Sequence, residues 1–509
     1  MQTSIGALVT QAAKQFGNKT AVIFEGRLLS FADIDLMSTK VATHLESLGV
    51  QRDQVVALYS QNCPEWIIAY YAILKIGAVV SPLNLMLTGS EAAFALADCK
   101  AVAVFATADK LSSLQEHVSS TQLTHLISIG ESSTQGALSF STLIGDTATL
   151  NDYPVAGLSP ESISTIGYTS GTTGHPKGAV LTHANILMNV AMTATMHVRT
   201  ESDTTVSALP LSHVYGNVVM NAAIAYGTTL VLHKSFDAEA VLTSIQEHRA
   251  TILEGVPTMY MYILDHPRLS EFDLSSLRRC TVGGQTMPEA KMQEVERLFG
   301  CRLLELWGMT ELGGLGATHS FYGPRRLGSI GVPLPQVEAR VIDPEHEGEE
   351  VPAGEIGELQ IRGPITMKEY LGRPDATLET KYLDGWLRTG DLARIDSEGF
   401  IYVVDRLKDM IITAGFNIYP AELERAICEH PAVAMVAVGS VPDSNKGELA
   451  KAYIVKKKGI DLDLDDLEKH CRARLAAYKV PRLYQLVEEL PKTSSGKIMR
   501  RMLRNHFES

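Results

Sequence analysis

A ten-residue segment rich in glycine and hydroxyl side chains constrains this chain more than any other part of it. The segment Thr169–Gly178 reads Thr-Ser-Gly-Thr-Thr-Gly-His-Pro-Lys-Gly. Its glycines can adopt positive-φ turns that point successive N–H groups into one concavity, its hydroxyls add donors, and Lys177 adds a compact positive charge. Short apolar runs on either side predict a strand, a loop and a second strand, with a helix beginning only near Thr182. The segment therefore predicts a loop that wraps a polyphosphate.

This loop differs from a Walker loop, in which Gly-x-x-x-x-Gly-Lys-Ser/Thr opens a helix. Counting from Gly171, Pro176 occupies the position of the second glycine, and Gly178 follows Lys177 where Ser or Thr would be required. Hydroxyl oxygens also suit the hard cation Mg²⁺, and we select Thr172 as a metal ligand. The predicted phosphate-binding residues are Thr169, Ser170, Gly171, Thr172, Thr173, Gly174 and Lys177.

Length and composition limit the class of protein. With 509 residues the chain is too long for one hydrophobic core, and its 45% hydrophobic and 20% charged residues are typical of a globular protein. A formal net charge of -13 argues against a nucleic-acid or anionic-membrane partner. The six cysteines lack Cys-x-x-Cys spacing, which predicts neither a zinc site nor a disulfide framework. We find no signal peptide and no apolar run that would span a bilayer, and expect a cytoplasmic protein.

Strand and helix patterns alternate along most of the chain. Ser30 and Asp33 have the spacing of a capping box, and Gly17 is placed to end a helix over residues 5–17. Further predicted strands are 55–59, 78–81 and 101–106, and further predicted helices are 30–48, 65–75 and 90–99. This alternation predicts an α/β fold with layered, largely parallel sheets.

A domain boundary is predicted at the charged segment 405–409. Before it, glycine-rich strands and turns indicate a small barrel that closes a large N-terminal domain. After it, a helix near 421–429, apolar strands near 432–441 and 449–455, and a later helix and strand predict a compact α+β unit. We expect an N-terminal domain over 1–405, a hinge over 406–409, and a smaller mobile C-terminal domain over 410–509.

Three further motifs follow the phosphate loop in order. They are Trp307-Gly308-Met309-Thr310-Glu311, Thr389-Gly390-Asp391, and Pro491-Lys492-Thr493-Ser494-Ser495-Gly496-Lys497. With these motifs the chain resembles the adenylate-forming superfamily, which includes acyl-CoA synthetases, luciferases and the adenylation domains of peptide synthetases. The resemblance covers about Ala21 to Arg504. It implies that ATP and Mg²⁺ activate a carboxylic acid as acyl-AMP, releasing pyrophosphate, and that the acyl group then passes to the thiol of coenzyme A.

The resemblance also implies a role for each motif residue. Thr310 would bond the α-phosphate and Glu311 would hold Mg²⁺, roles that suit a hydroxyl donor and a hard carboxylate. Trp307, Gly308 and Met309 would line the nucleotide, although the superfamily more usually has Tyr at position 307. Asp391 would accept hydrogen bonds from the ribose hydroxyls, with Arg406 adding contacts from the hinge. Lys497 would bridge the substrate carboxylate and the α-phosphate.

A domain rotation between the two half-reactions is a further implication. Lys177 and Lys497 must meet on the same phosphates, which requires the small domain to close over the large one. By resemblance, the small domain then turns about the hinge residue Lys408. The loop Thr413–Asn417, with Gly415 and Phe416, would swing in to line a tunnel for the pantetheine thiol. Most relatives have glycine where this chain has Ala414.

The pocket for the acid is less firmly specified by the sequence. The segment Pro210–Gly216 resembles the part of the superfamily that flanks the acid, where His213, Val214 and Tyr215 would contact it. The other walls would be Gly283, Gly284 and Gln285, the last two beside the nucleotide, and Gly313, Gly314 and Leu315. So many glycines indicate space for a flat ring or an extended chain, and the lack of Arg or Lys among these residues argues against a dicarboxylic acid. We expect a medium- or long-chain fatty acid, with an aryl or cinnamate-type acid as the alternative.

Other functions remain open at the level of sequence. A stand-alone acyl-AMP ligase that loads a carrier protein shares the first half-reaction, but no carrier domain follows Lys497 and no insertion follows the phosphate loop, which favours coenzyme A. A luciferase-like oxygenase would retain the same adenylation motifs. A binding module without turnover would be expected to have lost Lys497, Glu311 or Asp391, and all three are present. A homodimer is also possible.

Overall fold

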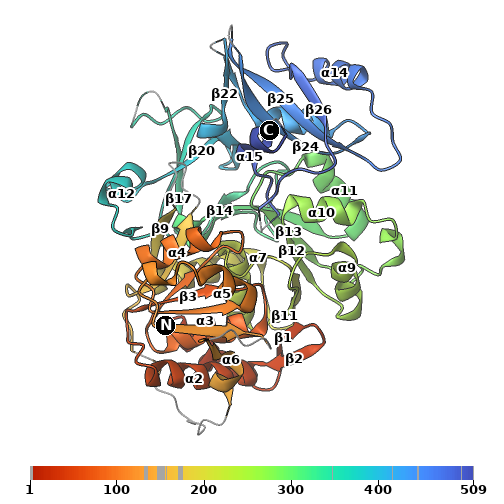
Figure 1. Ribbon diagram of the computed structural model, residues 1–509. Coiled ribbons are helices and arrows are strands. Elements are labelled where there is room, and N and C mark those ends of the chain that lie inside the picture. The colour runs from red at the N-terminus through yellow and green to blue at the C-terminus, as the bar shows by residue number, and fades with distance from the viewer. Residues whose placement is uncertain are drawn as a thin grey trace.

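The computed structural model describes residues 4–130, 136–145, 155, 157–169, 176–344, 346, 348–414, 416–443, 446–493 and 496–507. Figure 1 shows a large body that contains the N-terminus, capped by a smaller body formed by the last part of the chain. The two bodies confirm the predicted fold class, an α/β protein with a large N-terminal and a smaller C-terminal domain.

The first sheet of the large domain has the order β16-β15-β14-β13-β12-β10-β11-β1-β2. Its centre, from β14 to β1, is parallel, and its outer strands are antiparallel. The strands are β1 (Thr20–Phe24), β2 (Arg27–Ser30), β10 (Thr204–Ser207), β11 (Thr229–Leu232), β12 (Ile252–Gly255), β13 (Arg279–Gly283), β14 (Arg302–Met309), β15 (Gly314–Thr318) and β16 (Val332–Pro333).

The second sheet has the order β19-β9-β8-β4-β3-β5-β6-β7. Its strands from β8 to β7 are parallel, whereas β9 is antiparallel to both of its neighbours. The strands are β3 (Val55–Tyr59), β4 (Val79–Pro82), β5 (Ala103–Thr107), β6 (His125–Ile129), β7 (Leu138–Ser139), β8 (Ile163–Thr169), β9 (Lys177–Thr182) and β19 (Glu369–Tyr370). Parallel sheets need helical crossovers, which explains the alternation seen in the sequence.

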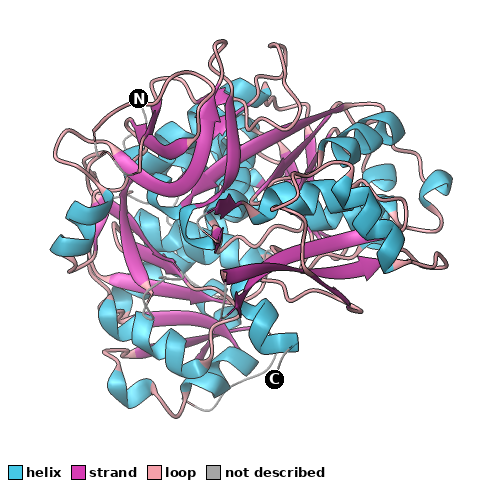
Figure 2. Ribbon diagram, turned by 90° about the horizontal axis from the view of Figure 1, so that it is seen from above, coloured by secondary structure: helices cyan, strands magenta, loops and turns pink. Residues whose placement is uncertain are grey.

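Helices cover both sheets, as the view from above shows (Figure 2). The large domain has α1 (Gly6–Phe16), α2 (Phe31–Ser47), α3 (Pro64–Lys75), α4 (Gly89–Asp98), α5 (Ala108–Leu114), α6 (Phe140–Ile144), α7 (His183–His197), α8 (Val214–Tyr226), α9 (Ala238–Glu247), α10 (Pro257–Leu264), α11 (Glu289–Phe299) and α12 (Pro374–Thr380). The largest hydrophobic cluster contains residues of both sheets together with α1, α2, α3, α7 and α8. The core therefore lies between the two sheets.

Local signals in the sequence are confirmed at several helix ends. Ser30 and Asp33 form the predicted capping box of α2, and Thr182 with Asn185 forms another at the start of α7. Gly17 ends α1 with a φ of 52°. These bonds satisfy N–H groups that a helix leaves unpaired in its first turn.

A third sheet connects the two domains. It contains β17 (Glu338–Ile342), β18 (Gly357–Arg362), β20 (Leu387–Ile395) and β21 (Ile401–Arg406), paired antiparallel in that order. The small barrel expected from the sequence is wrong in this respect, because β17 and β21 lie at opposite edges of an open sheet. Glycine-rich turns between short strands fit an open meander as well as a closed barrel, so the sequence pattern does not distinguish the two.

The C-terminal domain has its own sheet and core. The sheet contains β22 (Ile411–Thr413), β23 (Phe416–Ile418), β24 (Val433–Asp443), β25 (Gly447–Lys456) and β26 (Leu483–Leu486), and the helices are α13 (Pro420–Cys428), α14 (Leu464–Arg472) and α15 (Arg500–Phe507). Its apolar cluster includes residues of α13, α14, β24 and β25. In this domain the predicted helix and strand positions are close to those observed.

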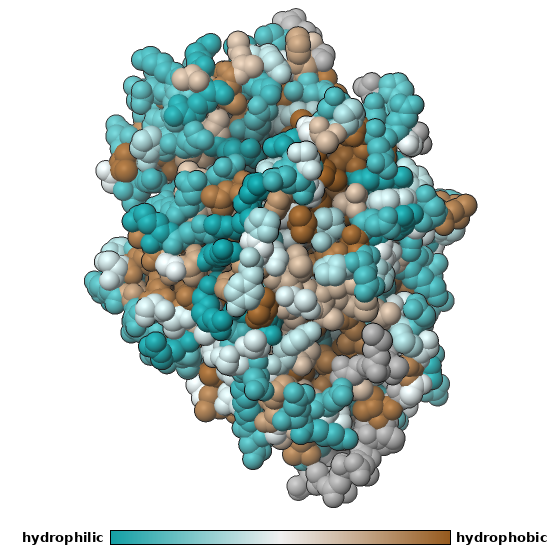
Figure 3. Space-filling view, turned by 180° about the vertical axis from the view of Figure 1, so that it is seen from behind, coloured by the Kyte–Doolittle hydropathy of each residue, from teal (hydrophilic) through white to brown (hydrophobic). Residues whose placement is uncertain are grey.

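The surface is mixed in character. The face turned away from the viewer in Figure 1 carries hydrophilic residues with smaller hydrophobic areas between them (Figure 3). Among the described residues, no helix has the length and apolar character needed to cross a bilayer.

Candidate active site

The strands on both sides of the phosphate loop are as predicted. β8 and β9 pair antiparallel up to Thr169 and Lys177, where the side-chain hydroxyl of Thr169 donates to the carbonyl of Lys177 at 3.4 Å. The tip of the loop, with the predicted residues Ser170, Gly171, Thr172, Thr173 and Gly174, lies outside the described residues. Only the two ends of the loop can therefore be placed, and they stand at the edge of the second sheet beside β19.

Tyr370 of β19 connects the phosphate loop to the predicted magnesium ligand. The Lys177 Nζ lies 5.3 Å from the centre of the Tyr370 ring, and the Tyr370 hydroxyl donates to Oε1 of Glu311 at 2.6 Å. Burial raises the pKa of the Glu311 carboxyl above its ordinary value, with the Tyr370 hydrogen bond acting in the opposite direction. A cation beside this carboxylate would favour its charged form. Sequence reasoning did not select Tyr370.

Thr310 and Glu311 stand in a short 3₁₀ turn, Thr310–Leu312, that follows β14. A Cβ placed on Gly167 of β8 would lie 2.8 Å from Cγ2 of Thr310, so the backbones of the two sheets approach closely here. The sequence motif around Glu311 is thereby brought against the strand that leads into the phosphate loop.

The Asp391 carboxylate, expected to bind ribose, is held at both oxygens. Nε1 of Trp307 donates to Oδ2 at 2.7 Å, and Nε of Arg406 lies 2.9 Å from Oδ1. Asp391 is 3% exposed, and this burial raises the pKa of its carboxyl while the Arg406 charge opposes the rise. Three of the predicted nucleotide residues therefore form one cluster.

The Lys497 side chain reaches into the large domain. Its Nζ lies 3.4 Å from Nε2 of His213. Burial, followed by the Arg406 charge, lowers the pKa of the Lys497 ammonium to about 8. A Cβ placed on Gly284 would lie 2.6 Å from Cε of Lys497, so only glycine admits the lysine at this position, where φ is +93°.

Two contacts hold the Lys497 loop in the large domain. The Gln285 side chain accepts from the N–H of Ile498 at 3.0 Å and donates to its carbonyl at 3.3 Å. The Thr258 hydroxyl of α10 donates to the carbonyl of Gly496 at 2.7 Å. The amide of Gln285 therefore pairs with the loop as a neighbouring strand would. Thr258 is a contact that the sequence did not indicate.

His213 is fixed at the start of α8. As the N-cap residue it accepts a hydrogen bond from the N–H of Tyr215 on Nδ1, at 3.3 Å, which leaves Nε2 facing Lys497. Burial and the Lys497 charge lower the pKa of His213 to about 3. The imidazole is therefore neutral at physiological pH.

Tyr215 points away from solvent into a buried polar cluster. Its hydroxyl lies 2.5 Å from Oγ1 of Thr281 and donates to Oε2 of Glu254 at 3.0 Å. Glu254 in turn pairs with Arg199, and all four side chains are almost fully buried. Arg199 thus lies near the predicted pocket wall and is connected to the wall residue Tyr215 through Glu254. The predicted wall residues themselves include no arginine.

The glycines of the predicted pocket walls mark close packing. A Cβ on Gly283 would lie 2.1 Å from Cδ1 of Leu306, and one on Gly314 would lie 2.5 Å from Oδ1 of Asn189. Gly313, with a φ of +62°, faces Ile186 at 2.9 Å. The expectation that these glycines leave open volume is therefore wrong for these three, because neighbouring side chains fill the space. Val214 begins α8, and Leu315 is buried in β15.

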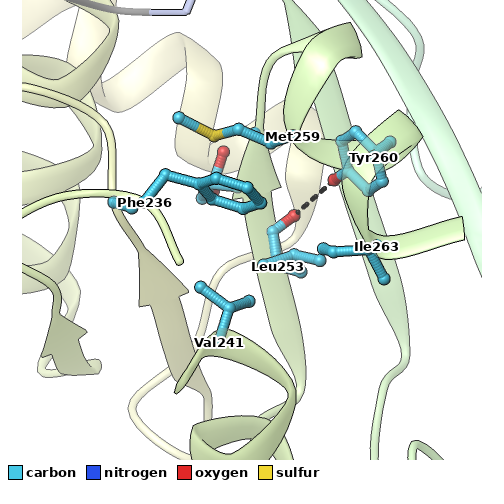
Figure 4. Close-up of a pocket in the computed structure, with 9 residues that line it drawn as sticks. Phe236, Val241, Leu253, Met259, Tyr260 and Ile263 are labelled. Atoms are coloured by element: carbon cyan, nitrogen blue, oxygen red, sulfur yellow. Dashed lines mark hydrogen bonds between the residues drawn. The ribbon is translucent and has the colours of Figure 1, made fainter. Parts of the chain in front are cut away.

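Two neighbouring pockets lie in this part of the molecule, and the larger one adjoins the Lys497 loop. The larger, about 800 Å³ including its open mouth, is lined by Lys234, Phe236, Tyr262, Lys492 and Gly496 among others. A smaller, mainly apolar pocket of about 220 Å³ shares Ala208, Phe236 and Met259 with it and lies between β12 and the helices α9 and α10 (Figure 4). The larger pocket thus includes two lysines, and the smaller one is mainly apolar.

Two predicted residues stand apart from this cluster. Phe416 is 55% exposed and packs against Tyr478 in a tilted arrangement, with ring centres 4.9 Å apart. Lys408 lies in the 3₁₀ turn Leu407–Asp409 between the domains. Gly415 lies outside the described residues. Among the described residues, no group of three or more His, Cys, Asp or Glu side chains is arranged to hold a metal by itself.

Comparison with known proteins agrees with this geometry. The model of the AMP-binding enzyme family matches residues 9–371, and that of the AMP-binding enzyme C-terminal domain matches residues 422–497. A long-chain-fatty-acid–CoA ligase of Bacillus subtilis (strain 168) is 36% identical over 530 residues, covering 98% of this chain and 94% of that protein. A feruloyl-CoA synthase of an Amycolatopsis species is 36% identical over 513 residues, covering 99% of each.

A solved structure has the same fold along nearly the whole chain. The anthranilate CoA ligase AuaEII, determined in complex with anthranoyl-AMP, superposes with a TM-score of 0.93 at 29% identity, covering 99% of this chain and 97% of that one. The similarity spans both domains.

Proposed function

The chain belongs to the AMP-binding enzyme family, and from this premise we propose how its residues divide the work of the reaction. The protein is an AMP-forming acyl-CoA synthetase: it activates a carboxylic acid with ATP as acyl-AMP and transfers the acyl group to coenzyme A. The roles of individual residues, the metal and the acid are proposals.

The contact between Lys497 and His213 carries the proposal for the first step. The Lys497 ammonium brings the main positive charge to the place where the acid carboxylate and the α-phosphate would meet, and burial strengthens its field. His213, held neutral, would orient the carboxylate and exclude water without competing for the negative charge. Thr310 would donate to the α-phosphate, and Lys177 with Thr169 and the loop tip would hold the departing pyrophosphate.

Asp391 and Arg406 would hold the ribose, and Trp307, Gly308, Met309, Gly284 and Gln285 would line the nucleotide. Support comes from the fixed orientation of Asp391, whose oxygens face Trp307 and Arg406. A carboxylate that is already oriented loses little entropy when it accepts hydrogen bonds from ribose hydroxyls.

Mg²⁺ is proposed as the metal, with Glu311 and Thr172 as its protein ligands. A buried carboxylate with a raised pKa fits a site that a cation completes, and nucleotide sites usually hold Mg²⁺ by one or two carboxylates together with phosphate oxygens. When bound, the ion would offset the negative charge of the phosphates.

The second step is proposed to follow a rotation about Lys408, within a hinge over 406–409 between domains 1–405 and 410–509. Lys497 would withdraw, and Gly415 and Phe416 would approach the acyl-AMP. The exposure of Phe416 supports this role, because an aromatic ring that faces solvent in one arrangement is available for a tunnel wall in another.

The acid is proposed to be a medium- or long-chain fatty acid, contacted by His213, Val214, Tyr215, Gly283, Gly313, Gly314 and Leu315. The similarity to a long-chain-fatty-acid–CoA ligase favours this class. The aryl alternative has its own support in the similarity to a feruloyl-CoA synthase and to AuaEII. We further propose a cytoplasmic enzyme that forms a homodimer, which light scattering would test.

Pyrophosphate release across a panel of acids tests the function. The panel runs from acetate through long fatty acids to benzoate and coumarate, with ATP and Mg²⁺, with and without coenzyme A. We expect long fatty acids to stimulate release and coenzyme A to accelerate it. Release that stops at one equivalent whatever coenzyme A is added would overturn the choice of acceptor and favour a carrier-protein thiol.

Lys497→Ala tests the assignment of the first step. We expect acid-dependent pyrophosphate release to fall by about 10²-fold or more, as for loss of a group that stabilises transition-state charge, while supplied acyl-AMP and coenzyme A still give thioester. Lys458→Ala, an exposed lysine of the same domain, is the matched control and should change neither step. Equal loss of both half-reactions would contradict a lysine that serves adenylation alone.

A further inference from the structure

Trp307 joins two parts of the site that are otherwise separate. One edge of its indole, Nε1, donates to the Asp391 carboxylate. The opposite edge, Cε3 and Cζ3, lies over Gly316 of β15, where an added Cβ would stand 3.0 and 2.6 Å from these two atoms. The side chain is 9% exposed. The indole thus fills the whole distance between the ribose carboxylate and the strand that carries Gly314 and Leu315.

The backbone of β15 is shaped around this ring. In the β14–β15 ladder, Trp307 pairs with Ala317 and Gly308 pairs with Leu315. Gly316 is therefore the extra residue of a β-bulge, between the partners of Trp307 and Gly308. Any other residue at 316 would place its Cβ within 3 Å of the six-membered ring. The indole ring therefore fits in this position because Gly316 has no side chain; Gly316 is called the seat of the indole below.

The indole N–H has a chemical property that the more usual tyrosine lacks. Its hydrogen is fixed in the plane of the ring and can only be donated, whereas the hydrogen of a phenol hydroxyl can rotate to another acceptor. With Arg406 on Oδ1, the carboxylate is held in one orientation before nucleotide arrives. The lone pairs that remain on the two oxygens are then available to the two ribose hydroxyls.

We propose that Trp307 is a positioning residue for the ribose of ATP, acting through the Asp391 carboxylate, and that Gly316 is required as its seat. The inference rests on the proposed function of Asp391. It adds a residue that sets recognition of the ribose hydroxyls through the donor of its indole ring.

Trp307→Phe tests the donor. The variant keeps an aromatic ring and removes the N–H, and a hydrogen bond to a charged group is commonly worth a factor of ten or more. We expect the KM for ATP to rise about tenfold with kcat changed less than threefold. For 2′-deoxy-ATP and 3′-deoxy-ATP the rise should be less than threefold, because the interaction that Trp307 orients is already reduced. An equal rise for ATP and both analogues would overturn the proposal.

A double-mutant cycle separates positioning from general damage. In an Asp391→Ala background, which removes the acceptor of the indole N–H, the further change Trp307→Phe should alter ATP binding less than twofold. If Trp307→Phe costs the same factor with and without Asp391, the indole acts independently of the carboxylate and the proposal fails. Thermal unfolding of each variant is measured alongside to confirm that it is folded.

Gly316→Ala tests the seat without touching the nucleotide cluster. We expect the added methyl group to displace the indole and to raise the KM for ATP about as much as Trp307→Phe does. In a Trp307→Tyr background the contact with the six-membered ring is removed and only the 2.8 Å approach of the added Cβ to Cδ1 of Leu312 remains, so Gly316→Ala should then raise the KM for ATP clearly less. Equal effects in the two backgrounds would show that the close approach to Trp307 is irrelevant.

Fluorescence gives a readout that does not need turnover. The chain has three tryptophans, so Trp66→Phe with Trp386→Phe leaves Trp307 as the only indole. We expect AMP to change the emission of this protein and adenine base alone to change it much less. Failure of the wild-type enzyme to release pyrophosphate with any acid would refute the proposed function, whereas a silent Trp307 in an active enzyme would refute only this inference.

Discussion

At the scale of single residues, burial sets the electrostatics of the site. His213 and Lys497 lie 3.4 Å apart, and the same desolvation lowers the pKa of both side chains. The imidazole becomes neutral at every physiological pH, whereas the ammonium titrates near pH 8. Lys497 is therefore the group of this pair whose charge changes within the working range of an enzyme.

The pH dependence of adenylation should show this titration. Lys497 is cationic below a pKa of about 8 and neutral above it, so kcat/KM for ATP-dependent pyrophosphate release should fall as pH rises through about 8. With the pKa of His213 at about 3, its titration should produce no inflection between pH 6 and 7. The measurement is a pH profile with pyrophosphate detection in the absence of coenzyme A.

A variant identifies the group responsible. Lys497→Arg carries a guanidinium that does not titrate in this range, so the activity that remains should lose its alkaline decline. A wild-type profile that stays flat to pH 10 would contradict the role of the Lys497 charge.

At the scale of elements, the turn between β22 and β23 carries backbone strain. Ala414 has a φ of +49°, in the left-handed region that disfavours residues with a Cβ. The strain stands in the loop proposed to approach acyl-AMP in the second half-reaction. The loop proposed to line the thiol tunnel therefore contains a residue whose backbone conformation glycine would adopt more easily.

Ala414→Gly should stabilise the C-terminal domain by about 0.5–1 kcal/mol, because relief of the left-handed strain exceeds the entropy that glycine adds to the unfolded chain. The same substitution at Ala473, which ends α14 with a φ of −75°, should destabilise it. Hydrogen exchange of β22 and β25 in urea measures both. Changes of the same sign in the two variants would contradict this account.

How much the sequence predicts depends on whether the signal is local. The capping box at Ser30 and the strands around the phosphate loop depend on neighbouring residues and were predicted closely. Other features depend on residues that are distant in sequence, and hydrophobic periodicity does not indicate such contacts. They are the open sheet of β17, β18, β20 and β21, the contact of Tyr370 with Glu311, and the cluster around Tyr215. The sequence predicts that glycines allow unusual backbone conformations or close approach. Whether the space beside a glycine is open depends on side chains that are distant in sequence.

At the scale of the whole molecule, an ion cluster spans the proposed hinge. Arg500 of α15 lies 2.7 Å from the Asp405 carboxylate, which also accepts from the N–H of Ala421 at 2.7 Å. Asp405 lies before Lys408 in the sequence, whereas its partners Arg500 and Ala421 lie after Lys408. Arg500 also pairs with Glu424 in its own domain, a contact that a rotation about Lys408 would preserve.

Asp405→Asn should therefore favour departure from the observed arrangement. Removing the Asp405 charge destabilises only the arrangement in which Asp405 and Arg500 are paired. We expect acyl-AMP formation to fall by about tenfold or more and the conversion of supplied acyl-AMP to thioester to be retained or faster. Glu424→Gln is the matched control, since its contact lies within one domain and both steps should change together.

Two outcomes would contradict the role of this cluster. One is an equal loss of the two half-reactions in Asp405→Asn. The other is a shift in their ratio with Glu424→Gln as large as with Asp405→Asn.

The close approach of Trp307 to Gly316 also restricts the order in which this site was able to evolve. A lineage that began with a smaller aromatic ring at 307 and a side chain at 316 had to lose that side chain first, because the indole and a Cβ at 316 would lie within 3 Å. In the reverse direction, tryptophan at 307 favours glycine at 316. The two positions are expected to change as a pair across descendants of this chain, with glycine arriving first and leaving last.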